Sequence, residues 1–490
     1  MKSLKEVEEN RILYHSKPHH NTIHRASLMA PVIPGSRVGI SFLNHFLIKR
    51  NYSHVALKVT GLDGHGQKGS DITVSITEPR VYSFDLQELL PGNFSLYNVE
   101  FFSEQNLFIP FPAVMVNHTT PVSKNQVHSF NRVLNDVFEN DKVNANHVRE
   151  SNIDVIFNEN AETFLLFQVG PQPIRDSLSV ELKISGKTLS KNIDINAERF
   201  EHKLFRISEI FPEIKSATQG ILKVLQPKQF MFYGRMMCGL IGKDGSLIAN
   251  HSYYDSSEFA EYWKDNSPSR IHYPYFKELT QKLRFYPIMS PSNLSLRLRA
   301  FDIHGKEIIP LATVGRIISP SDEVFEINVN KLVGKLPVSS FELVVESETP
   351  LPTRVNHQVV YSGNEKSESS VNLSFKNPNV FNPPGKKGFV WGQLYADESY
   401  DSYLGITSYD FKDNKESSEG YLEIYSEQGC VFEKSFPFSS IASVQWKLSE
   451  LVPGAKGYHW FVFKAPTPNL SSFSVIVNKI TGHCSGEHGF

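Results

Sequence analysis

Alternation of apolar and polar residues with a period of two dominates the chain. The stretch 54–60 alternates in this way, stops at the glycine-rich turn 63–66, and is followed by a returning stretch at 71–76. Alternation that ends in a glycine turn is typical of a half-buried strand entering a β-hairpin. Because runs with a helical period are scarce, the pattern predicts an all-β protein.

The predicted hairpin recurs along the chain at a near-constant interval. Its turn glycines are Gly66, Gly186, Gly305 and Gly429, which are separated by 120, 119 and 124 residues. After each hairpin comes a strand that runs into a short apolar turn, and then a strand that ends in asparagine. Landmarks that recur in the same order at such an interval indicate internal duplication. A unit of about 120 residues is long enough to bury a core of its own.

We therefore predict four tandem β-sandwich repeats joined by short helical junctions. The predicted divisions are an N-terminal arm over residues 1–33 and repeats over residues 34–145, 146–272, 273–378 and 379–490. The junction helices are expected at residues 131–138 and 258–263. A β-propeller is a weaker alternative, because its blades are shorter than these intervals.

Composition narrows the class of partner. Apolar residues make up 40% of the sequence and charged residues 21%, which is ordinary for a globular chain. The formal net charge of −2 creates no general attraction to nucleic acid or to an anionic membrane. No uncharged apolar run approaches the roughly 18 residues of a membrane helix. We therefore expect a soluble protein without a nucleic-acid or membrane partner.

The cysteines and the N-terminus bear on the compartment. Cys238, Cys430 and Cys484 are the only cysteines, and an odd number in a long chain argues against a disulfide framework. The first ten residues are charged and contain no apolar core of a signal peptide. Both features predict a cytoplasmic protein.

An Asn-His pair at strand ends is the first candidate for chemistry. The pairs are Asn117-His118, Asn250-His251 and Asn356-His357. In a structural interpretation the amide ties a turn and the imidazole covers the edge of the sandwich. In a functional interpretation the pairs bind a ligand or a metal where repeats meet. We favour the structural interpretation, because recurrence suits a requirement of the fold, and because Lys479 replaces the histidine after Asn478.

Three further groups could carry binding or metal chemistry. A hairpin could bring His118 and His128 together as metal ligands. After His251, the side chains of Tyr254 and Asp255 could bind a polar ligand through a hydroxyl and a carboxylate, but we favour a surface loop without a ligand.

The C-terminus offers the third group. Imidazole and thiolate ligands lie close together in His483, Cys484 and His488. Their softness would suit zinc, copper or iron, so a divalent transition metal is the one cofactor that the sequence suggests. The alternative is a glycine-loosened tail without a metal.

Common catalytic signatures are missing. Gly-x-Ser-x-Gly, His-Glu-x-x-His and paired Cys-x-x-Cys motifs do not occur, and no residue is assigned a catalytic role. We therefore predict a non-catalytic scaffold that presents strand-end loops to a protein or glycan partner. The alternatives are a metal-dependent enzyme with a histidine-rich site, and a structural subunit that assembles with itself through strand edges.

Overall fold

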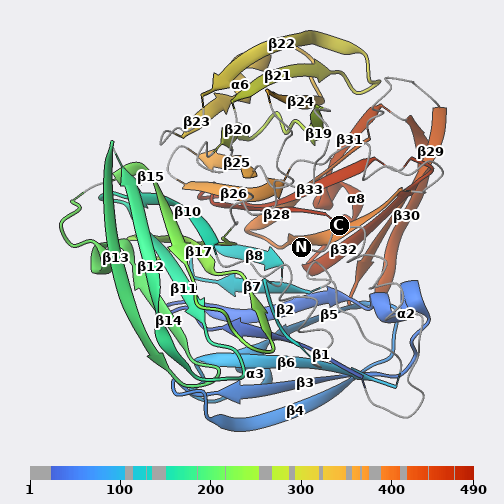
Figure 1. Cartoon of the computed structure of the whole chain (residues 1–490). Coiled ribbons are helices and arrows are strands. Elements are labelled where there is room, and N and C mark those ends of the chain that lie inside the picture. The colour runs from blue at the N-terminus through green and yellow to red at the C-terminus, as the bar shows by residue number, and fades with distance from the viewer. Residues whose placement is uncertain are drawn as a thin grey trace. The chain divides into compact units, whose positions relative to one another are not determined.

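The chain is built almost entirely of antiparallel strands in a computed structural model (Figure 1). Strands make up 65% of the structure and helices 6%, so the all-β prediction is confirmed. No helix among the described residues is long and apolar enough to cross a membrane. The structure describes residues 24–104, 114–128, 130–134, 150–184, 186–215, 217–252, 268–285, 293–318, 324–348, 356–364, 367–374, 388–408, 417–439, 441–467 and 469–489.

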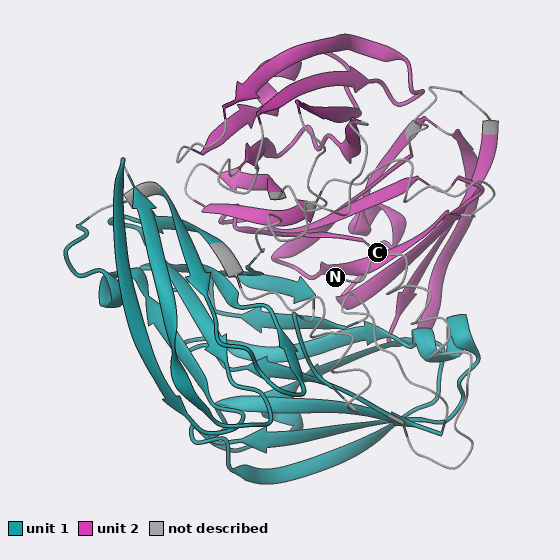
Figure 2. Ribbon diagram, in the orientation of Figure 1, with its two compact units in different colours: residues 1–254 teal, residues 255–490 magenta. Residues whose placement is uncertain are grey.

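The chain divides into two compact units, residues 1–254 and residues 255–490 (Figure 2). Each unit contains two segments of eight strands. The eight strands of a segment form two sheets of four, which in segment 2 are joined by one residue pair. We number the segments 1 to 4 in chain order. Segments 1 and 2 form unit 1, and segments 3 and 4 form unit 2.

Segment 1 has one sheet of order β1-β6-β3-β4 and another of order β5-β2-β7-β8. Its elements are β1 (His24–Pro31), β2 (Arg37–Leu43), α2 (His45–Arg50), β3 (Val55–Leu62), β4 (Lys68–Ile76), β5 (Val81–Asp85), α3 (Leu86–Leu89), β6 (Leu96–Ser103), β7 (Met115–Thr119) and β8 (Lys124–His128). Two further short strands, β9 (Asn131–Val133) and β16 (Phe232–Gly234), extend the first sheet beyond β1.

Segment 2 repeats this order, with β10-β15-β12-β13 in one sheet and β14-β11-β17-β18 in the other. A single residue pair between β10 and β11 joins the two sheets at one side. Its elements are β10 (Glu150–Phe157), β11 (Ala161–Gln168), β12 (Ile174–Ile184), β13 (Lys187–Ala197), β14 (His202–Arg206), α5 (Ile207–Ile210), β15 (Ala217–Leu225), β17 (Met237–Gly242) and β18 (Leu247–His251).

Segment 3 has the sheets β19-β24-β21-β22 and β23-β20-β25-β26. Its elements are β19 (Ser269–Pro274), β20 (Thr280–Phe285), β21 (Leu294–Phe301), β22 (Glu307–Ile317), β23 (Phe325–Asn328), α6 (Val329–Val333), β24 (Ser340–Ser347), β25 (Asn356–Asn364) and β26 (Ser367–Ser374).

Segment 4 has the sheets β27-β32-β29-β30 and β31-β28-β33-β34. Its elements are β27 (Gly388–Ala396), β28 (Tyr400–Ser408), β29 (Ser417–Ser426), β30 (Gly429–Ser439), β31 (Ala442–Lys447), α8 (Leu448–Leu451), β32 (Gly457–Ala465), β33 (Leu470–Asn478) and β34 (Cys484–His488). Counted from the start of each segment, the strand orders 1-6-3-4 and 5-2-7-8 therefore occur four times. That four copies arose by duplication stays a prediction.

The apolar cores lie between the two sheets of a segment. In segment 1, Phe42 on β2 meets Phe101 on β6 with ring centroids 5.1 Å apart. In segment 2, one buried cluster joins Leu165 on β11 to Leu182 on β12. In segment 3, the cluster also takes in Phe473 and its neighbours from segment 4, so these two segments share a core. This sharing differs from the expectation that every repeat would enclose an interior of its own.

The predicted turn glycines occupy equivalent hairpins. Gly66, Gly186, Gly305 and Gly429 have φ angles of 68°, 73°, 71° and 104°, in the left-handed region that glycine adopts without a steric penalty. Each lies between strands 3 and 4 of its segment or at the first residue of strand 4. The hairpin prediction is confirmed at all four positions.

Inside each unit, the hairpin of the first segment docks on the second segment. A Cβ atom on Gly66 would lie 1.9 Å from the carbonyl oxygen of Arg199, and one on Gly305 would lie 2.2 Å from the carbonyl oxygen of Ile441. Only glycine permits such a close approach of two backbones. By contrast, a Cβ atom on Gly186 would meet no atom within 4 Å.

The two docked hairpins share a loop with the sequence Asp-x-His-Gly. In the loop of segment 1, the Oδ1 atom of Asp63 accepts hydrogen bonds from the amides of His65 and Gln67, at 2.9 and 2.8 Å. In the loop of segment 3, Asp302 accepts from His304 and Lys306 at 2.8 and 2.9 Å. The carboxylate therefore fixes the loop that docks.

The last strands of the two segments in each unit also meet. The hydroxyl of Ser123, just before β8, accepts the amide of Leu247 on β18 at 2.9 Å. In unit 2, the hydroxyl of Ser369 on β26 accepts the amide of Gly486 on β34 at 3.0 Å. A serine in the first segment thus holds an edge amide of the second segment in both units.

Three boundary and helix predictions were wrong. Residues 24–31, assigned to the N-terminal arm, form the internal strand β1, because Ala26, Leu28 and Ala30 alternate toward the core behind a His-rich stretch. The boundary at 272/273 falls inside β19.

The helix predicted at 131–138 begins instead as strand β9. The amide side chain of Asn131 pairs with the backbone nitrogen and oxygen of Met29 at 2.8 and 3.0 Å, which ties the segment to β1. The helix at 258–263 and the boundaries near 145 and 378 lie outside the described residues.

Candidate functional site

The Asn-His pairs do not occupy equivalent places. His118 lies at the end of β7, opposite Val38. His357 lies at the start of β25, opposite Phe285, at the other end of the equivalent strand pair. His251 ends β18, an outer strand that pairs only with β17 among the described strands. The motif therefore marks no single position of the fold.

Two of the predicted ligand residues, Tyr254 and Asp255, lie outside the described residues, and only the backbone of Asn356 is described. Asn117 is buried on β7. The Oδ1 atom of Asn250 accepts the backbone amide of His251 at 2.7 Å, a local contact of the kind that ties a turn.

His118 is fully buried inside segment 1. Its Nδ1 atom lies 3.4 Å from the hydroxyl of Ser36, and that hydroxyl donates to the carbonyl of Ile33 at 2.8 Å. Burial lowers the pKa of His118 to about 4, so the imidazole is neutral near pH 7. Its Nε2 atom and the Oδ1 atom of Asn125, which lies directly opposite, have no hydrogen-bond partner among the described residues.

The hairpin of β7 and β8 separates His118 from His128. His118 lies opposite Asn125, whereas His128 lies opposite Met115. Directly opposite residues share a face of the sheet, and residues three apart on one strand point to opposite faces. The two imidazoles therefore point away from each other, and the predicted metal pair does not form.

His128 instead meets His251 and Arg235, which precedes β17. The two imidazole rings lie 4.6 Å apart, and a guanidinium nitrogen of Arg235 is 3.0 Å from Nε2 of His128. Another guanidinium nitrogen is 3.2 Å from Nε2 of His251, whose Nδ1 lies 2.8 Å from the carbonyl oxygen of Ser252.

The partners define the tautomers of these histidines. The carbonyl oxygen of Ser252 only accepts, and at 2.8 Å it places the proton of His251 on Nδ1, although a guanidinium nitrogen of Arg235 also lies 3.2 Å from that atom. A guanidinium only donates, so Nε2 of His128 accepts. A metal ion on either Nε2 atom would have to displace the cation of Arg235. The arrangement is therefore that of a structural tie between segments 1 and 2.

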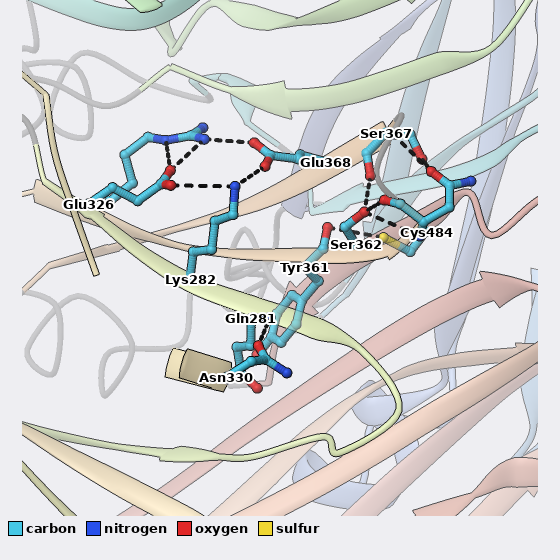
Figure 3. A network of polar contacts seen from close by, with 11 residues as sticks. Gln281, Lys282, Glu326, Asn330, Tyr361, Ser362, Ser367, Glu368 and Cys484 are labelled. Carbon is cyan, nitrogen blue, oxygen red and sulfur yellow. Dashed lines mark hydrogen bonds and ion pairs between the residues drawn. The ribbon is translucent and has the colours of Figure 1, made fainter. Parts of the chain in front are cut away.

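The predicted C-terminal ligands lie on β34 or next to it, where successive side chains alternate between faces. Cys484 points into the core of segment 3, and its thiol donates to the carbonyl of Tyr361 at 3.2 Å (Figure 3). Burial raises the pKa of Cys484 to about 12, which disfavours the thiolate that binds metals. His483 precedes it on the opposite face, and His488 lies four residues further along the strand. These three side chains do not converge.

His357 is also engaged in the core. The hydroxyl of Tyr273 is hydrogen-bonded to Nε2 of His357, and both side chains are fully buried. The ring of His357 stacks on Phe285 with centroids 5.6 Å apart. These contacts agree with the structural interpretation of the Asn-His pair at this position.

One polar cluster was missed by sequence reasoning. On β20, Lys282 lies between Glu326 on β23 and Glu368 on β26, at 3.4 and 2.6 Å (Figure 3). Arg284 joins the same two carboxylates at 3.0 and 2.6 Å and is 7% exposed. The two cations alternate on one strand, but their partners come from distant positions, so only the register of the sheet reveals the cluster. Its charges balance, and it ties three strands together.

The outer strands of the four segments form a second feature that the sequence did not single out. Strand 4 of each segment, which is β4, β13, β22 or β30, ends its sheet, and at most two of its residues are buried. Such edges offer unpaired backbone groups to another strand. Their position follows from the strand order, which no local motif encodes.

Comparisons with known proteins give no family. No protein-family profile and no curated protein matches the sequence. A β-glucuronidase 2 of Bacteroides uniformis is 10% identical, with a TM-score of 0.15, over 47% of this chain and 27% of that chain. The viral chemokine binding protein R17, encoded by a rodent gammaherpesvirus, is 8% identical, with a TM-score of 0.17, over 76% of this chain and 89% of that chain. At these scores the likeness supports no argument about fold or function.

Proposed function

We propose that the protein is a non-catalytic scaffold that binds a protein or glycan partner. The observation that supports this proposal is that the residues predicted to bind a metal do not come together inside either unit. His118 and His128 face opposite sides of a sheet, and His483, Cys484 and His488 are divided between the two faces of one strand. Residues that are tied individually into cores and junctions suit a structural role better than a shared reaction centre.

The exposed parts of the sheets support the binding half of the proposal. Each segment ends one sheet in a long strand whose residues are mostly exposed or half-buried, at the outer edge of a sandwich. Rigid scaffolds that present edges and loops are a common design for recognition, because little order is lost on binding.

A metal-dependent enzyme is the competing proposal, and the observation in its favour concerns His118. Its neutral imidazole carries an Nε2 lone pair that no described residue uses, with Asn125 directly opposite. Imidazole nitrogen and amide oxygen are both metal ligands.

The metal content of the purified full-length protein separates the two proposals. We expect zinc, iron and copper to remain well below one equivalent per chain, both in the natural protein and in His118→Gln. One equivalent of metal in the natural protein that is lost in His118→Gln, with a control substitution such as His304→Gln retaining it, would contradict the scaffold proposal.

A further inference from the structure

The four outer strands differ in how well they are protected against pairing. The ladder between β3 and β4 shifts register near Thr60, that between β21 and β22 shifts repeatedly, and that between β29 and β30 shifts at Ile424. In addition, Pro310 lies within β22 and Pro437 lies within β30. Bulges and prolines are two of the devices by which edge strands resist the addition of another strand.

Strand β13 has neither device. Its eleven residues pair with β12 without a register shift, from Ile174 opposite Ala197 to Ile184 opposite Lys187. No proline occurs in it. Figure 1 shows β13 as the outermost strand of the green sheet. Among the four equivalent edges, β13 is therefore the one that presents a long, regular row of backbone groups interrupted by neither a bulge nor a proline.

The side chains of β13 that face the core are incompletely covered. Leu189 and Ile193 are half-buried, whereas Leu182 and Leu178, directly opposite them on β12, are fully buried. A further strand would cover the exposed parts of Leu189 and Ile193. This apolar area favours a partner strand with apolar residues on the same side.

The charges on this face define the partner further. The ammonium of Lys191 is occupied by the carbonyl of Ile210 at 2.8 Å and by Glu213 at 3.2 Å. Lys187 is exposed and has no ion-pair partner among the described residues. A carboxylate on the added strand opposite Lys187 would pair with it.

We propose that β13 accepts an extended strand of a partner protein that carries an acidic residue opposite Lys187 and apolar residues opposite Leu189 and Ile193. The added strand binds through main-chain hydrogen bonds, and its alternate side chains select it. The proposal rests on the binding function proposed above and names its surface.

A second copy of this chain suits the edge less well. Two β13 strands could pair in antiparallel orientation with their core-facing side chains on the same side of the sheet. In that arrangement, only odd-numbered residues of the second β13 can lie opposite Lys187. These are Lys187, Leu189, Lys191, Ile193, Ile195 and Ala197, and none of them is acidic.

Two labelled peptides of eleven residues test the proposal on the full-length protein. Both alternate valine and threonine, and at the position that pairs with Lys187 one carries glutamate and the other lysine. In fluorescence anisotropy titrations, we expect the glutamate peptide to bind saturably and about tenfold more tightly than the lysine peptide. Lys187→Glu should invert this preference. The matched substitution Lys434→Glu, on the protected edge β30, should leave it unchanged.

Several outcomes would overturn the assignment. Absence of saturable binding would do so, as would a preference that Lys187→Glu does not invert in a protein with an unchanged circular dichroism spectrum. Dimerisation in sedimentation velocity that Ile193→Lys abolishes would assign the edge to a second copy instead. If neither peptide binds and the purified protein contains no metal, the strand-addition proposal is wrong but the scaffold proposal is not. Only stoichiometric bound metal would contradict the scaffold proposal.

Discussion

The two units of the chain are assembled in the same way from different side chains. In both, the Asp-x-His-Gly hairpin of the first segment docks on a backbone carbonyl of the second, at Gly66 in unit 1 and at Gly305 in unit 2. In both, a serine of the first segment, Ser123 or Ser369, holds an edge amide of the second. The geometry of the junction is therefore common to the units.

The short helices after strand 5 also differ between the first and second segments of a unit, and they differ in the same way in both units. In the first segments, the side chains of Asp85 and Asn328 accept the amides at the start of the helix. In the second segments, Glu209 and Glu450 reach back to the backbone amide before the helix, at 3.0 and 3.2 Å. These local features thus recur every two segments.

The chemistry inside the junctions differs. In unit 1, the junction contains the imidazoles of His128 and His251 around Arg235, and β9 and β16 add main-chain pairing. In unit 2, β33 and β34 contribute Phe473 and Cys484 to the core of segment 3. Both junctions also contain contacts of the other kind, since Gln445 donates to the carbonyls of Tyr275 and Ser339 in unit 2, and Phe232 packs with Met29 in unit 1. The residues that hold the two junctions nevertheless differ, so the units should respond to different perturbations.

Acid should produce the largest difference in stability between the two units. Burial lowers the pKa values of His45, His118 and His202 in unit 1 to about 3, 4 and 4. In unit 2, burial lowers the pKa of His272 to about 3 and also lowers that of His459. A histidine that takes up a proton only after unfolding removes stability as the pH falls below its unfolded pKa of about 6.5.

At pH 5, each of the histidines with a pKa near 3 or 4 costs roughly 2 kcal/mol. Unit 1 should therefore lose about 6 kcal/mol through its three such histidines, and unit 2 about 2 kcal/mol through His272 in addition to the contribution of His459. All four tryptophans lie in residues 255–490, so their fluorescence reports unit 2, whereas far-ultraviolet circular dichroism reports both units. Urea unfolding at pH 5 should therefore show a dichroism change before the fluorescence change. Coincident transitions, or an unaltered pH dependence in His118→Leu, would contradict this account.

Removal of Phe473 should break the apolar junction of unit 2. The side chain is 2% exposed, and its ring lies 5.7 Å from that of Tyr273. Phe473→Ala should cost unit 2 about 4 kcal/mol, because the cavity opens in a core shared by segments 3 and 4. The tryptophan fluorescence transition in urea measures the loss. A change below 1 kcal/mol would mean that segment 4 contributes little to this core.

Alanine at the docked glycines should weaken both units. Gly66→Ala and Gly305→Ala should each cost about 3 kcal/mol, since the new methyl group meets a backbone carbonyl and the φ angle disfavours alanine. Gly186→Ala is the matched control and should cost about 1 kcal/mol, because only the φ angle opposes it. Dichroism follows Gly66→Ala, and fluorescence follows Gly305→Ala. Equal losses at Gly66 and Gly186 would argue against docking.

Neutralisation of Glu368 should give the smallest effect. Burial alone would raise the pKa of Glu368, but the charges of Arg284 and Lys282 outweigh it and lower the pKa. A lowered carboxyl pKa adds stability above the unfolded value of about 4.5, and this stability is lost as the pH falls. Glu368→Gln should cost unit 2 about 1 kcal/mol at pH 7, and this cost should shrink progressively as the pH falls below about 4.5. A loss that does not shrink with falling pH would indicate a packing defect.

Local backbone chemistry explains which features the sequence predicted. The four turn glycines were identified because alternating strands that stop at glycine have few other structures available. The positions of segments 1 to 4 follow from these hairpins. The expectation that His118, His251 and His357 occupy equivalent positions was wrong. A short motif does not reveal which strand of a sheet carries it.

Long-range register explains what the sequence missed. His118 and His128 share a hairpin, but only the length of its turn decides that they face opposite sides. Arg235 lies 107 residues from His128, so no local pattern links them. The exposed edge of β13 likewise follows from strand order, although its unbroken alternation is visible in the sequence.

Hydrogen exchange of backbone amides in the full chain, read by mass spectrometry, tests the shared architecture most directly. The amides of His65 and Gln67 in one loop, and of His304 and Lys306 in the other, should exchange slowly, because docking stabilises the loops that contain them. The two-residue turn at 427–428 should exchange fast. Exchange in the loops 63–67 and 302–306 as fast as at 427–428 would contradict the claim that both units are built around docked hairpins.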